Sequence, residues 1–594
     1  MRTNDEVAAL LAEYADLLAI TGGDAFRIRS YEKAARSVGG YPEDLARVDP
    51  AELDRIPNVG RAIAAKIRDY LGTGHIRQLE ALRAKVPAGV RRLTGVPGLG
   101  PKRAMALFTE RGIDSVDALE AAIAAGRLEG LPGFGAKSEE NLLRGIELIR
   151  KSAGRVRIDT AMDLAGELIA RLSAVPGCTR CAYAGSLRRM RDTIGDVDIL
   201  AVATDPAALM AAFRELPLAA EVIASGDAKT SIRTPDGIQA DLRVVPEGSW
   251  GAALQYFTGS QAHNVRLREM AVHRKLKLSE YGLFDAGHDT GTGARIAAAS
   301  EEEVYQALGL PWIPPPLRED SGEIEAALRG ELPVLVTEAD LRGDLHTHTN
   351  LTDGVAPLAD MVAAAAARGY SYYAITDHAP NLFMQRMTDE KMLAQRAEVA
   401  RLDGQYGDGQ DGGMRLLHGT ELNIGPDGEV DWPAEFLDRF DLCVASVHSH
   451  FTQPREEMTR RMLRAIENPH VAILGHPTTR LIGRRPPVDV DLDAVYQACA
   501  RTGTAIEIDA FPDRLDLSAE HVRLARRHGV KFSIDSDAHA VGHLSVMRYG
   551  IGTAQRGWLS PDDVINTWPL ARLMAFLQAK RATYPGGAGG PARR

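Results

Sequence analysis

Cysteine, aromatic residues and long apolar runs are all scarce in this sequence. Its 594 residues include four cysteines and 6% aromatic residues. Four cysteines are too few for a disulfide framework in a chain of this length, which indicates a reducing compartment. No apolar run is long enough to cross a bilayer, and the first residues lack the pattern of a signal peptide. We therefore expect a cytoplasmic protein that does not enter membranes.

Charge and histidine are unevenly distributed along the chain. The net charge is −10, but residues 1–280 carry 39 basic and 36 acidic side chains, so the acidity is mostly C-terminal. Residues 61–111 carry 11 basic and three acidic side chains, a balance that suits contact with phosphates. Of the 16 histidines, 12 follow residue 340. The two ends of the chain are therefore expected to carry different chemistries.

Three short segments in the first 140 residues resemble one another. They read Ile56-Pro-Asn-Val-Gly60, Val96-Pro-Gly-Leu-Gly100 and Leu131-Pro-Gly-Phe-Gly135, and each lies between helical patterns. Their glycines permit tight turns that expose backbone N–H groups at a helix start, an arrangement that binds phosphate. The repeats resemble helix-hairpin-helix motifs, which bind the DNA backbone without reading its sequence. The candidate DNA-binding residues are Gly60, Gly98, Gly100, Lys102, Gly133, Gly135 and Lys137.

Three aspartates occur in alternating apolar runs after residue 155, where the all-helical pattern becomes mixed. Asp196 and Asp198 are two residues apart, so on a strand both carboxylates project from one face. Asp241 lies in a second run, Gln239 to Val245. Three acids on neighbouring strands can hold two hard divalent cations, which clamp the oxygens of a phosphoryl transfer.

A glycine-serine turn precedes these aspartates. Gly185 and Ser186 would begin a helix whose amides face an anion, and Arg189 adds a charge-assisted contact. A triphosphate fits such a site. These residues carry a resemblance to the family X DNA polymerases that extends from the N-terminus to about residue 317. The resemblance implies a nucleotidyltransferase palm in which Gly185, Ser186, Arg189 and Gly195 bind the nucleotide.

The same resemblance implies roles for the aspartates and for residues further along. Asp196, Asp198 and Asp241 would bind two Mg²⁺ or Mn²⁺ ions, and Asp241 would help to deprotonate the primer 3'-hydroxyl. The segment Tyr256-Phe-Thr-Gly-Ser260 matches the family motif at the nucleotide sugar. It assigns nucleotide binding to Tyr256, Phe257, Gly259 and Asn264, and a template contact to Arg268.

The first helix-hairpin-helix segment is similar to the family's 5'-deoxyribose phosphate lyase domain. Lys66 occupies the position of the amine that forms a Schiff base, so the resemblance implies a catalytic lysine there. One departure is Ala62, where the eukaryotic relative carries a phosphate-binding lysine. A lone lysine on a helix is otherwise a solvated charge, and this alternative stays open.

Beyond residue 340, apolar runs repeatedly end in residues that bind metals. Helical patterns separate these runs, and in a β/α barrel this order places each ligand at the C-terminal rim of the strands. Mixed imidazole and carboxylate ligands suit manganese, iron or zinc, and their number exceeds the need of one ion. The candidates are His346, His348, Asp353, His378, Glu421, His448, His476, Asp537 and His539.

This ligand set resembles the PHP (polymerase and histidinol phosphatase) domain over residues 342–575. The resemblance implies a distorted (β/α)7 barrel with two or three ions and phosphoester hydrolysis by a metal-activated water. Asp509 stands where the family typically carries Asn. His450 is left open as a phosphate contact, whereas His418, His470, His521 and His528 are interpreted as core or surface residues.

The predicted architecture is multidomain. The proline-rich segment 310–316 marks the main boundary. The expected domains are a lyase-like helical domain (1–90), a helix-hairpin-helix domain (91–155), an α+β palm (156–247), a thumb (248–317), a linker (318–341), the PHP domain (342–580) and a disordered tail (581–594).

Together these features predict a monomeric, nucleoid-associated repair DNA polymerase that fills gaps with deoxynucleoside triphosphates on gapped or primed DNA. The PHP domain would trim 3' termini, with AP endonuclease or 3'-phosphatase activity as further options. One alternative is a non-catalytic scaffold at DNA ends, whose signature would be lost ligands. Another makes the PHP domain a small-molecule phosphatase or a structural metal domain, because ligands alone do not define a substrate.

Overall fold

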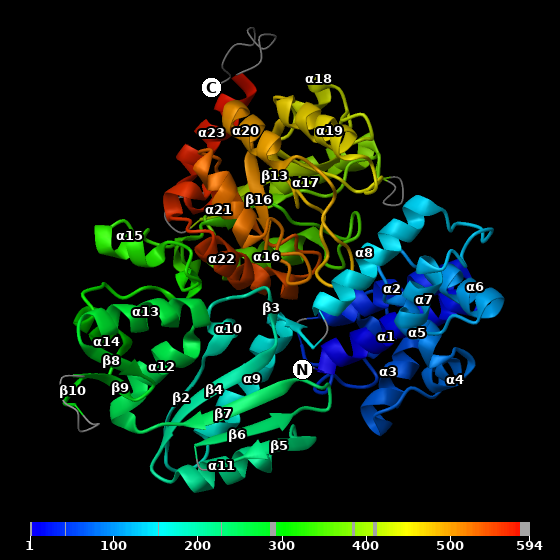
Figure 1. Ribbon diagram of the computed structural model, residues 1–594. Coiled ribbons are helices and arrows are strands. Elements are labelled where there is room, and N and C mark those ends of the chain that lie inside the picture. Colours follow the sequence, from blue (N-terminus) through cyan, green and yellow to red (C-terminus); the bar gives the residue numbers. More distant parts are fainter. Residues whose placement is uncertain are drawn as a thin grey trace.

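The computed structural model describes residues 3–41, 43–152, 154–226, 228–285, 293–382, 387–407 and 413–582. A helical part, a mixed α/β part and a barrel lie side by side (Figure 1). In the described part, none of the helices combines the length and apolar character needed to cross a membrane. The disordered tail predicted from residue 581 falls, from residue 583 on, outside the described residues.

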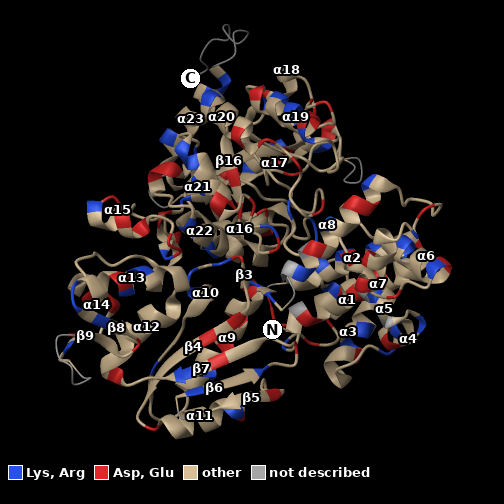
Figure 2. Ribbon diagram, viewed as in Figure 1, with Lys and Arg blue, Asp and Glu red and all other residues tan. Residues whose placement is uncertain are grey.

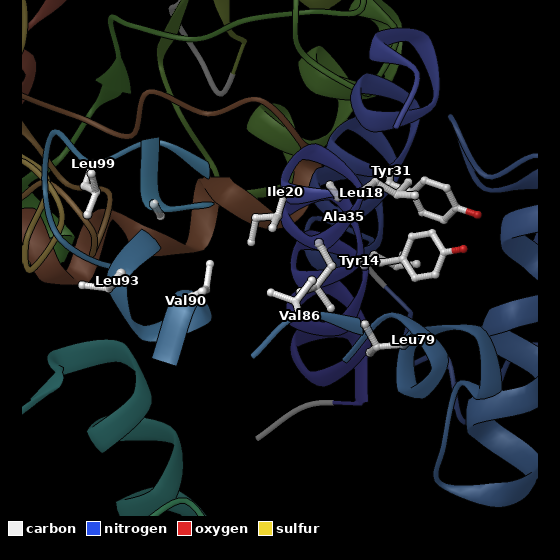
Figure 3. Packing of buried hydrophobic residues seen from close by; sticks show 14 of the residues in the cluster. Tyr14, Leu18, Ile20, Tyr31, Ala35, Leu79, Val86, Val90, Leu93 and Leu99 are labelled. Atoms are coloured by element: carbon white, nitrogen blue, oxygen red, sulfur yellow. The ribbon is translucent and has the colours of Figure 1, made fainter. Parts of the chain in front are cut away.

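The N-terminal part is all helical, as predicted, and it has one continuous core. A single cluster of buried apolar residues runs from Val7 to Ile146, so the two predicted helical domains share packing. Figure 3 shows part of this cluster around Tyr14, Leu18 and Val90. The elements are α1 (Thr3–Ile20), α2 (Ala25–Gly39), η1 (Leu53–Arg55), α3 (Arg61–Thr73), α4 (Arg77–Lys85), α5 (Ala88–Thr94), α6 (Pro101–Arg111), α7 (Val116–Ala124) and α8 (Ala136–Ser152).

The three repeated segments form the same turn before α3, α6 and α8. In each, the third residue is left-handed: Asn58, Gly98 and Gly133 have φ values of 62°, 82° and 83°. Asparagine tolerates this conformation better than other residues with a side chain, which explains why the first copy lacks the glycine. The remaining glycines and the two lysines proposed to bind DNA are exposed at these turns, namely Gly60, Gly100, Lys102, Gly135 and Lys137.

The palm is a five-stranded sheet in the order β2-β4-β7-β6-β5, in which only β4 and β7 run parallel. Val197 and Ile199 of β4 pack in the core with α9 and α11, whereas Leu200 and Val202 pack on the opposite face. The elements are β1 (Val156–Arg157), α9 (Ile158–Ser173), β2 (Cys178–Tyr183), α10 (Gly185–Arg188), β3 (Thr193–Ile194), β4 (Asp196–Ala203), α11 (Pro206–Arg214), β5 (Glu221–Ser225), β6 (Lys229–Arg233) and β7 (Gln239–Val244).

The thumb packs short helices around a three-stranded sheet, β10-β9-β8. The segment 318–341, predicted as a linker, is packed against its neighbours: Arg318 is buried against Glu301, and Val336 lies in the barrel core. The elements are η2 (Glu247–Ser249), α12 (Trp250–Thr258), α13 (Gln261–His273), β8 (Leu276–Ser279), β9 (Gly282–Asp285), β10 (Arg295–Ala297), α14 (Glu301–Ala307), η3 (Pro315–Leu317), α15 (Glu323–Arg329) and η4 (Glu338–Asp340).

The C-terminal part is a seven-stranded parallel barrel with strands in sequence order. A parallel bridge between Thr347 and Ala538 joins the segments that follow its first and last strands. Its strands are β11 (Gly343–Asp344), β12 (Tyr372–Ile375), β13 (Arg415–Asn423), β14 (Leu442–Ser446), β15 (Val471–Leu474), β16 (Ala505–Asp509) and β17 (Phe532–Asp535). Its helices are α16 (Leu358–Ala367), α17 (Asp389–Tyr406), α18 (Ala434–Leu437), α19 (Arg455–Glu467), α20 (Leu492–Thr502), α21 (Ala519–Arg527), η6 (Val541–Val546), α22 (Met547–Arg556), η7 (Pro561–Asp563), η8 (Ile565–Thr567) and α23 (Leu570–Ala582).

The barrel is packed against both the palm and the thumb (Figure 1). Leu515 and Tyr549 of the barrel belong to the palm core, and Trp558 belongs to the thumb core. An ion pair also joins Arg480 of the barrel to Asp192 of the palm, with 3.3 Å between nitrogen and oxygen. Apolar burial and charge pairing therefore fix the barrel relative to the palm.

One buried amide bridges the first and last strands of the barrel. The Asn566 side chain accepts a hydrogen bond from the Ile534 N–H at 3.1 Å and donates to the carbonyls of Ile534 and Gly343 at 2.5 and 3.1 Å. We expect Asn566→Ala to lower the free energy of unfolding by roughly 2 to 4 kcal/mol, because buried backbone groups lose their partner. Urea unfolding followed by circular dichroism measures this. The exposed amide variant Gln497→Ala serves as control, and equal stability of the two variants would contradict the argument.

Candidate active sites

Three carboxylates meet where β4 and β7 run side by side in the palm. Asp198 of β4 is the register partner of Asp241 of β7, and Asp196 lies two residues before Asp198 on the same face. One oxygen from each of the three lies within 4.8 Å of the others. Figure 2 shows acidic and basic bands on these adjoining strands. The carboxylates offer only oxygen ligands, which hard divalent cations prefer.

Gly185 lies directly against this carboxylate group. Its φ is +61°, and a Cβ on this residue would collide with Oδ2 of Asp198. Burial, together with the charges of Asp196 and Asp241, raises the pKa of Asp198 to about 7. Bound cations would relieve this repulsion, so the residues present fit a divalent metal site.

Lys229 of β6 is a partner of Asp241 that sequence reasoning missed. Its Nζ lies 2.5 Å from Oδ2 of Asp241, and Gln239 donates to the other carboxylate oxygen at 3.0 Å. Burial would raise the pKa of Asp241, but hydrogen bonds from Lys229, Ser231 and Gln239 hold it below its ordinary value. A lone lysine on a strand looks solvated in sequence, and only the pairing of β6 with β7 reveals the contact.

The proposed triphosphate ligands lie on and next to α10 and directly before β4, but Arg189 is engaged by protein partners. Its Nε donates to Glu319 at 3.0 Å and its Nη1 donates to the carbonyl of Thr258 at 2.6 Å. Ser186 is half-buried in α10, and Gly195 directly precedes the first aspartate. These bonds engage Nε and Nη1, so a phosphate would meet Arg189 at Nη2 or displace one of the two partners.

The segment after α12 holds the predicted sugar and base contacts. Tyr256 and Phe257 pack edge to face with centroids 5.1 Å apart, and Gly259 has a φ of 71°. The amide of Asn264 donates to the carbonyl of Tyr256 at 2.7 Å, so its orientation is fixed. Arg268, one turn later on α13, is exposed.

Lys66 lies on α3, away from the palm carboxylates. Its Nζ donates to the carbonyl of Ala62 at 3.2 Å and lies 5.3 and 5.4 Å from the ring centroids of Tyr14 and Tyr31. These two rings lie side by side, with centroids 4.4 Å apart (Figure 3). The catalytic role of Lys66 stays a prediction.

The barrel brings all nine predicted ligands together at the C-terminal ends of its strands. Glu421 is the centre of the group: its carboxylate lies 2.8 Å from His378, 3.0 Å from His448 and 3.1 Å from His476. Most of the others form overlapping groups around it, within which the ligand atoms lie within 4.8 Å of one another. These groups are His348, Asp353, His378 and His539; His346, His348 and Asp537; and His378, Glu421 and His448.

The chemistry of this cluster fits several metal ions. Burial would raise the pKa of Glu421, but the surrounding imidazoles, His448 and His378 foremost, hold it well below its ordinary value. Within the described residues, Nδ1 of His348 and Nδ1 of His476 are buried without a hydrogen-bond partner. The lone pairs of such ring nitrogens, which lie among buried carboxylates, are available to bind a metal ion.

A set of buried carboxylates behind the ligands was not predicted as functional. Glu507 of β16 lies 2.6 Å from Nδ1 of His346 and accepts the backbone N–H of His476 at 2.5 Å. Asp509, the departure from the PHP pattern, is paired with Arg514 at 3.2 Å. Glu507 and Asp509 lie at the end of an apolar run, as most of the ligands do. This pattern could have identified them from the sequence.

The cluster opens into a cavity of about 270 Å³. Besides the ligands, its walls include Arg485, Arg514 and Phe451, and the Arg485 guanidinium lies 4.2 Å from the centroid of the Phe451 ring. Two cations and an aromatic ring beside a metal cluster suit a nucleotide phosphate and its base. His450 is exposed and bonded to Ser449, while His418 is buried against Phe440.

Replacing Gly185 by alanine tests the palm geometry. Because the added Cβ collides with Asp198 and the backbone is left-handed, we expect nucleotide addition to fall by about 100-fold or more. Primer extension measures the loss. Gly166→Ala on α9 is the matched control, since no atom lies within 4 Å of a Cβ there. Normal extension by the Gly185 variant would contradict the assigned geometry.

Replacing Glu507 by glutamine tests the support behind the barrel ligands. The neutral amide holds His346 less firmly, so we expect metal content and phosphoester hydrolysis to fall by about 10- to 100-fold. Hydrolysis of bis(p-nitrophenyl) phosphate and elemental analysis measure the two effects. Glu467→Gln, at an exposed carboxylate of α19, is the control. A Glu507 variant with full metal content and activity would remove this role.

Comparisons with known protein families match four parts of the chain. They are a helix-hairpin-helix domain over residues 2–76, a SAM-like helix-hairpin-helix tandem over 90–147, a DNA polymerase beta thumb over 253–319 and a PHP domain over 344–510. The helix-hairpin-helix and thumb matches indicate a protein that binds DNA.

Individual relatives cover the same parts. The chain is 34% identical to the DNA polymerase/3'-5' exonuclease PolX of Bacillus subtilis (strain 168) over 576 residues, which are 96% of this chain and 99% of that protein. It is 26% identical to DNA polymerase lambda of Rattus norvegicus over 50% of this chain and 53% of the relative. A probable phosphatase of Thermoanaerobacter sp. (strain X514) is 26% identical over 41% of this chain and 97% of its own length. The chain belongs to the bacterial DNA polymerase X family, in which a family X DNA polymerase is joined to a C-terminal PHP domain.

Proposed function

We propose that this chain fills short gaps in DNA at the palm and trims 3' termini at the barrel. The palm assignment rests above all on the register that pairs Asp198 with Asp241 and groups their oxygens with those of Asp196. The barrel assignment rests on the convergence of nine metal-binding side chains, with Glu421 at their centre. The nucleoid association, the monomeric state and the lyase activity at Lys66 stay predictions.

At the palm, Asp196, Asp198 and Asp241 would hold two Mg²⁺ or Mn²⁺ ions. Bound there, such ions neutralise the charge of a triphosphate and align the attacking and leaving oxygens. Asp241, freed from Lys229, would accept the proton of the primer 3'-hydroxyl. The fixed Asn264 and the Tyr256–Phe257 pair would position the base and sugar of a deoxynucleoside triphosphate, and Arg268 would contact the template strand.

At the barrel, the imidazoles and carboxylates would hold two or three Mn²⁺, Zn²⁺ or iron ions, which supply an activated water and polarise the phosphoryl group. Glu507 keeps the His346 ring oriented, and Arg485 and Arg514 would bind the phosphate being cleaved. The resemblance to a probable phosphatase supports a second function, the hydrolysis of a terminal phosphate. A non-catalytic scaffold is disfavoured because every ligand position is filled.

Two pairs of substitutions separate the two activities. We expect Asp196→Ala with Asp198→Ala to abolish primer extension and spare trimming, and His346→Ala with His348→Ala to do the reverse. A 5'-labelled primer on DNA with a one-nucleotide gap, incubated with Mn²⁺ with and without deoxynucleotides, reports both on a sequencing gel.

The matched controls are Asp236→Ala in an exposed palm turn and His528→Ala in the barrel. Extension that persists without the palm aspartates would overturn the polymerase assignment. Trimming that persists without the two histidines would assign trimming to another site. On a second primer that ends in a 3'-phosphate, release of this phosphate without shortening would favour the phosphatase function.

A further inference from the structure

A second cavity, of about 200 Å³, lies between the N-terminal helical part and the barrel. One wall is formed by Lys33 and Arg36 of α2 and by the hairpin residue Asn58; the opposite wall is the loop from Asn350 to Val355. Asp353 lines this cavity and also the cavity of the barrel metal cluster. The two cavities therefore adjoin at a metal-binding residue.

The two walls are held in place by close packing. A Cβ on Gly40, just after α2, would collide with Ala540 of the barrel and lie 3.1 Å from Nε2 of His543. The side chain of Asn58 donates to Ser37 Oγ at 3.0 Å, which ties the hairpin to α2. The cavity is thus a defined feature of the contact between the two parts.

The charge on its helical wall is unbalanced. Lys33 and Arg36 are exposed and three residues apart, so they are neighbours on one face of α2. In the described part of the chain, neither forms an ion pair with a carboxylate. Asp353, the acid in the opposite wall, is engaged by His378 and His539, at 3.3 Å from each. Two unpaired cations beside neutral Asn and Thr side chains suit an anionic ligand.

We infer that this cavity binds a backbone phosphodiester of the DNA strand whose 3' end enters the barrel cluster, so that the nuclease site includes side chains from the lyase-like helical part. The inference rests on the proposed trimming function. It goes beyond that function because it gives side chains of α2 a role in DNA binding that the PHP ligands alone would not predict. The hairpin that carries Asn58 is one of the three expected to bind the DNA backbone, and here it lies at the edge of the metal cluster.

The test is a full-length variant with Lys33→Glu and Arg36→Glu, assayed on two substrates with Mn²⁺. On a 5'-labelled single-stranded oligonucleotide we expect kcat/KM to fall by about tenfold or more, because phosphate contacts are lost. For the same reason, the slope of log KM against log salt concentration should decrease by roughly one. Hydrolysis of bis(p-nitrophenyl) phosphate, too small to span both cavities, should stay within about twofold of wild type. Arg47→Glu, an exposed cation of the same helical part that does not line the cavity, is the matched control.

Unchanged oligonucleotide trimming by the double variant would overturn the inference, as would an equal loss in the Arg47 variant or on both substrates. A wild-type protein that trims no DNA would instead overturn the proposed function. A binding measurement then tests the cavity separately from trimming. The oligonucleotide should suppress acetylation of Lys33, read by mass spectrometry, more than acetylation of the exposed Lys275. Equal labelling of the two lysines would refute the site.

Discussion

The close packing of α22 between the barrel and the palm is the contact that holds the two enzymes together. Gly550 lets this helix approach Ala510 and Ile534 of the barrel, and Gly552 admits Met190 of the palm. Side chains at either glycine would push the helix off one neighbour. At its C-terminal end, Arg556 donates to Glu319 at 2.8 Å. Both active sites therefore sit on one packed body.

The two metal sites differ in ligand chemistry, although both act on phosphoesters. The palm offers carboxylates alone, two of them half-buried and one buried, and suits hard divalent cations. The barrel surrounds Glu421 with imidazoles and buries the group, which suits ions that stay bound. This division follows the uneven distribution of histidine along the chain.

The sequence alone was sufficient to predict those site residues whose positions follow a local sequence pattern. Asp196 and Asp198 follow the two-residue period of a strand, and most of the barrel ligands follow an apolar run, so the places of these residues could be predicted. Lys229 could not be, because its contact with Asp241 depends on which strands pair. The packing of residues 318–341, which were expected to form a linker, could not be predicted either: Arg318 is buried because Glu301, in another element, balances its charge.

The ion pairs of Glu319 link the barrel to the segment around Arg189, which is proposed to bind the nucleotide. Burial would raise the pKa of Glu319, but Arg189 and Arg556 hold it below its ordinary value, and Arg556 also donates to the backbone carbonyl of Arg189 at 2.9 Å. Arg191 also lies 3.6 Å from this carboxylate, so a triphosphate that drew Arg189 away would leave Glu319 between Arg191 and Arg556. If nucleotide binding shifted α22 through this carboxylate, then a strand end bound at the barrel would change nucleotide affinity by the same factor, because coupling between two binding sites is reciprocal.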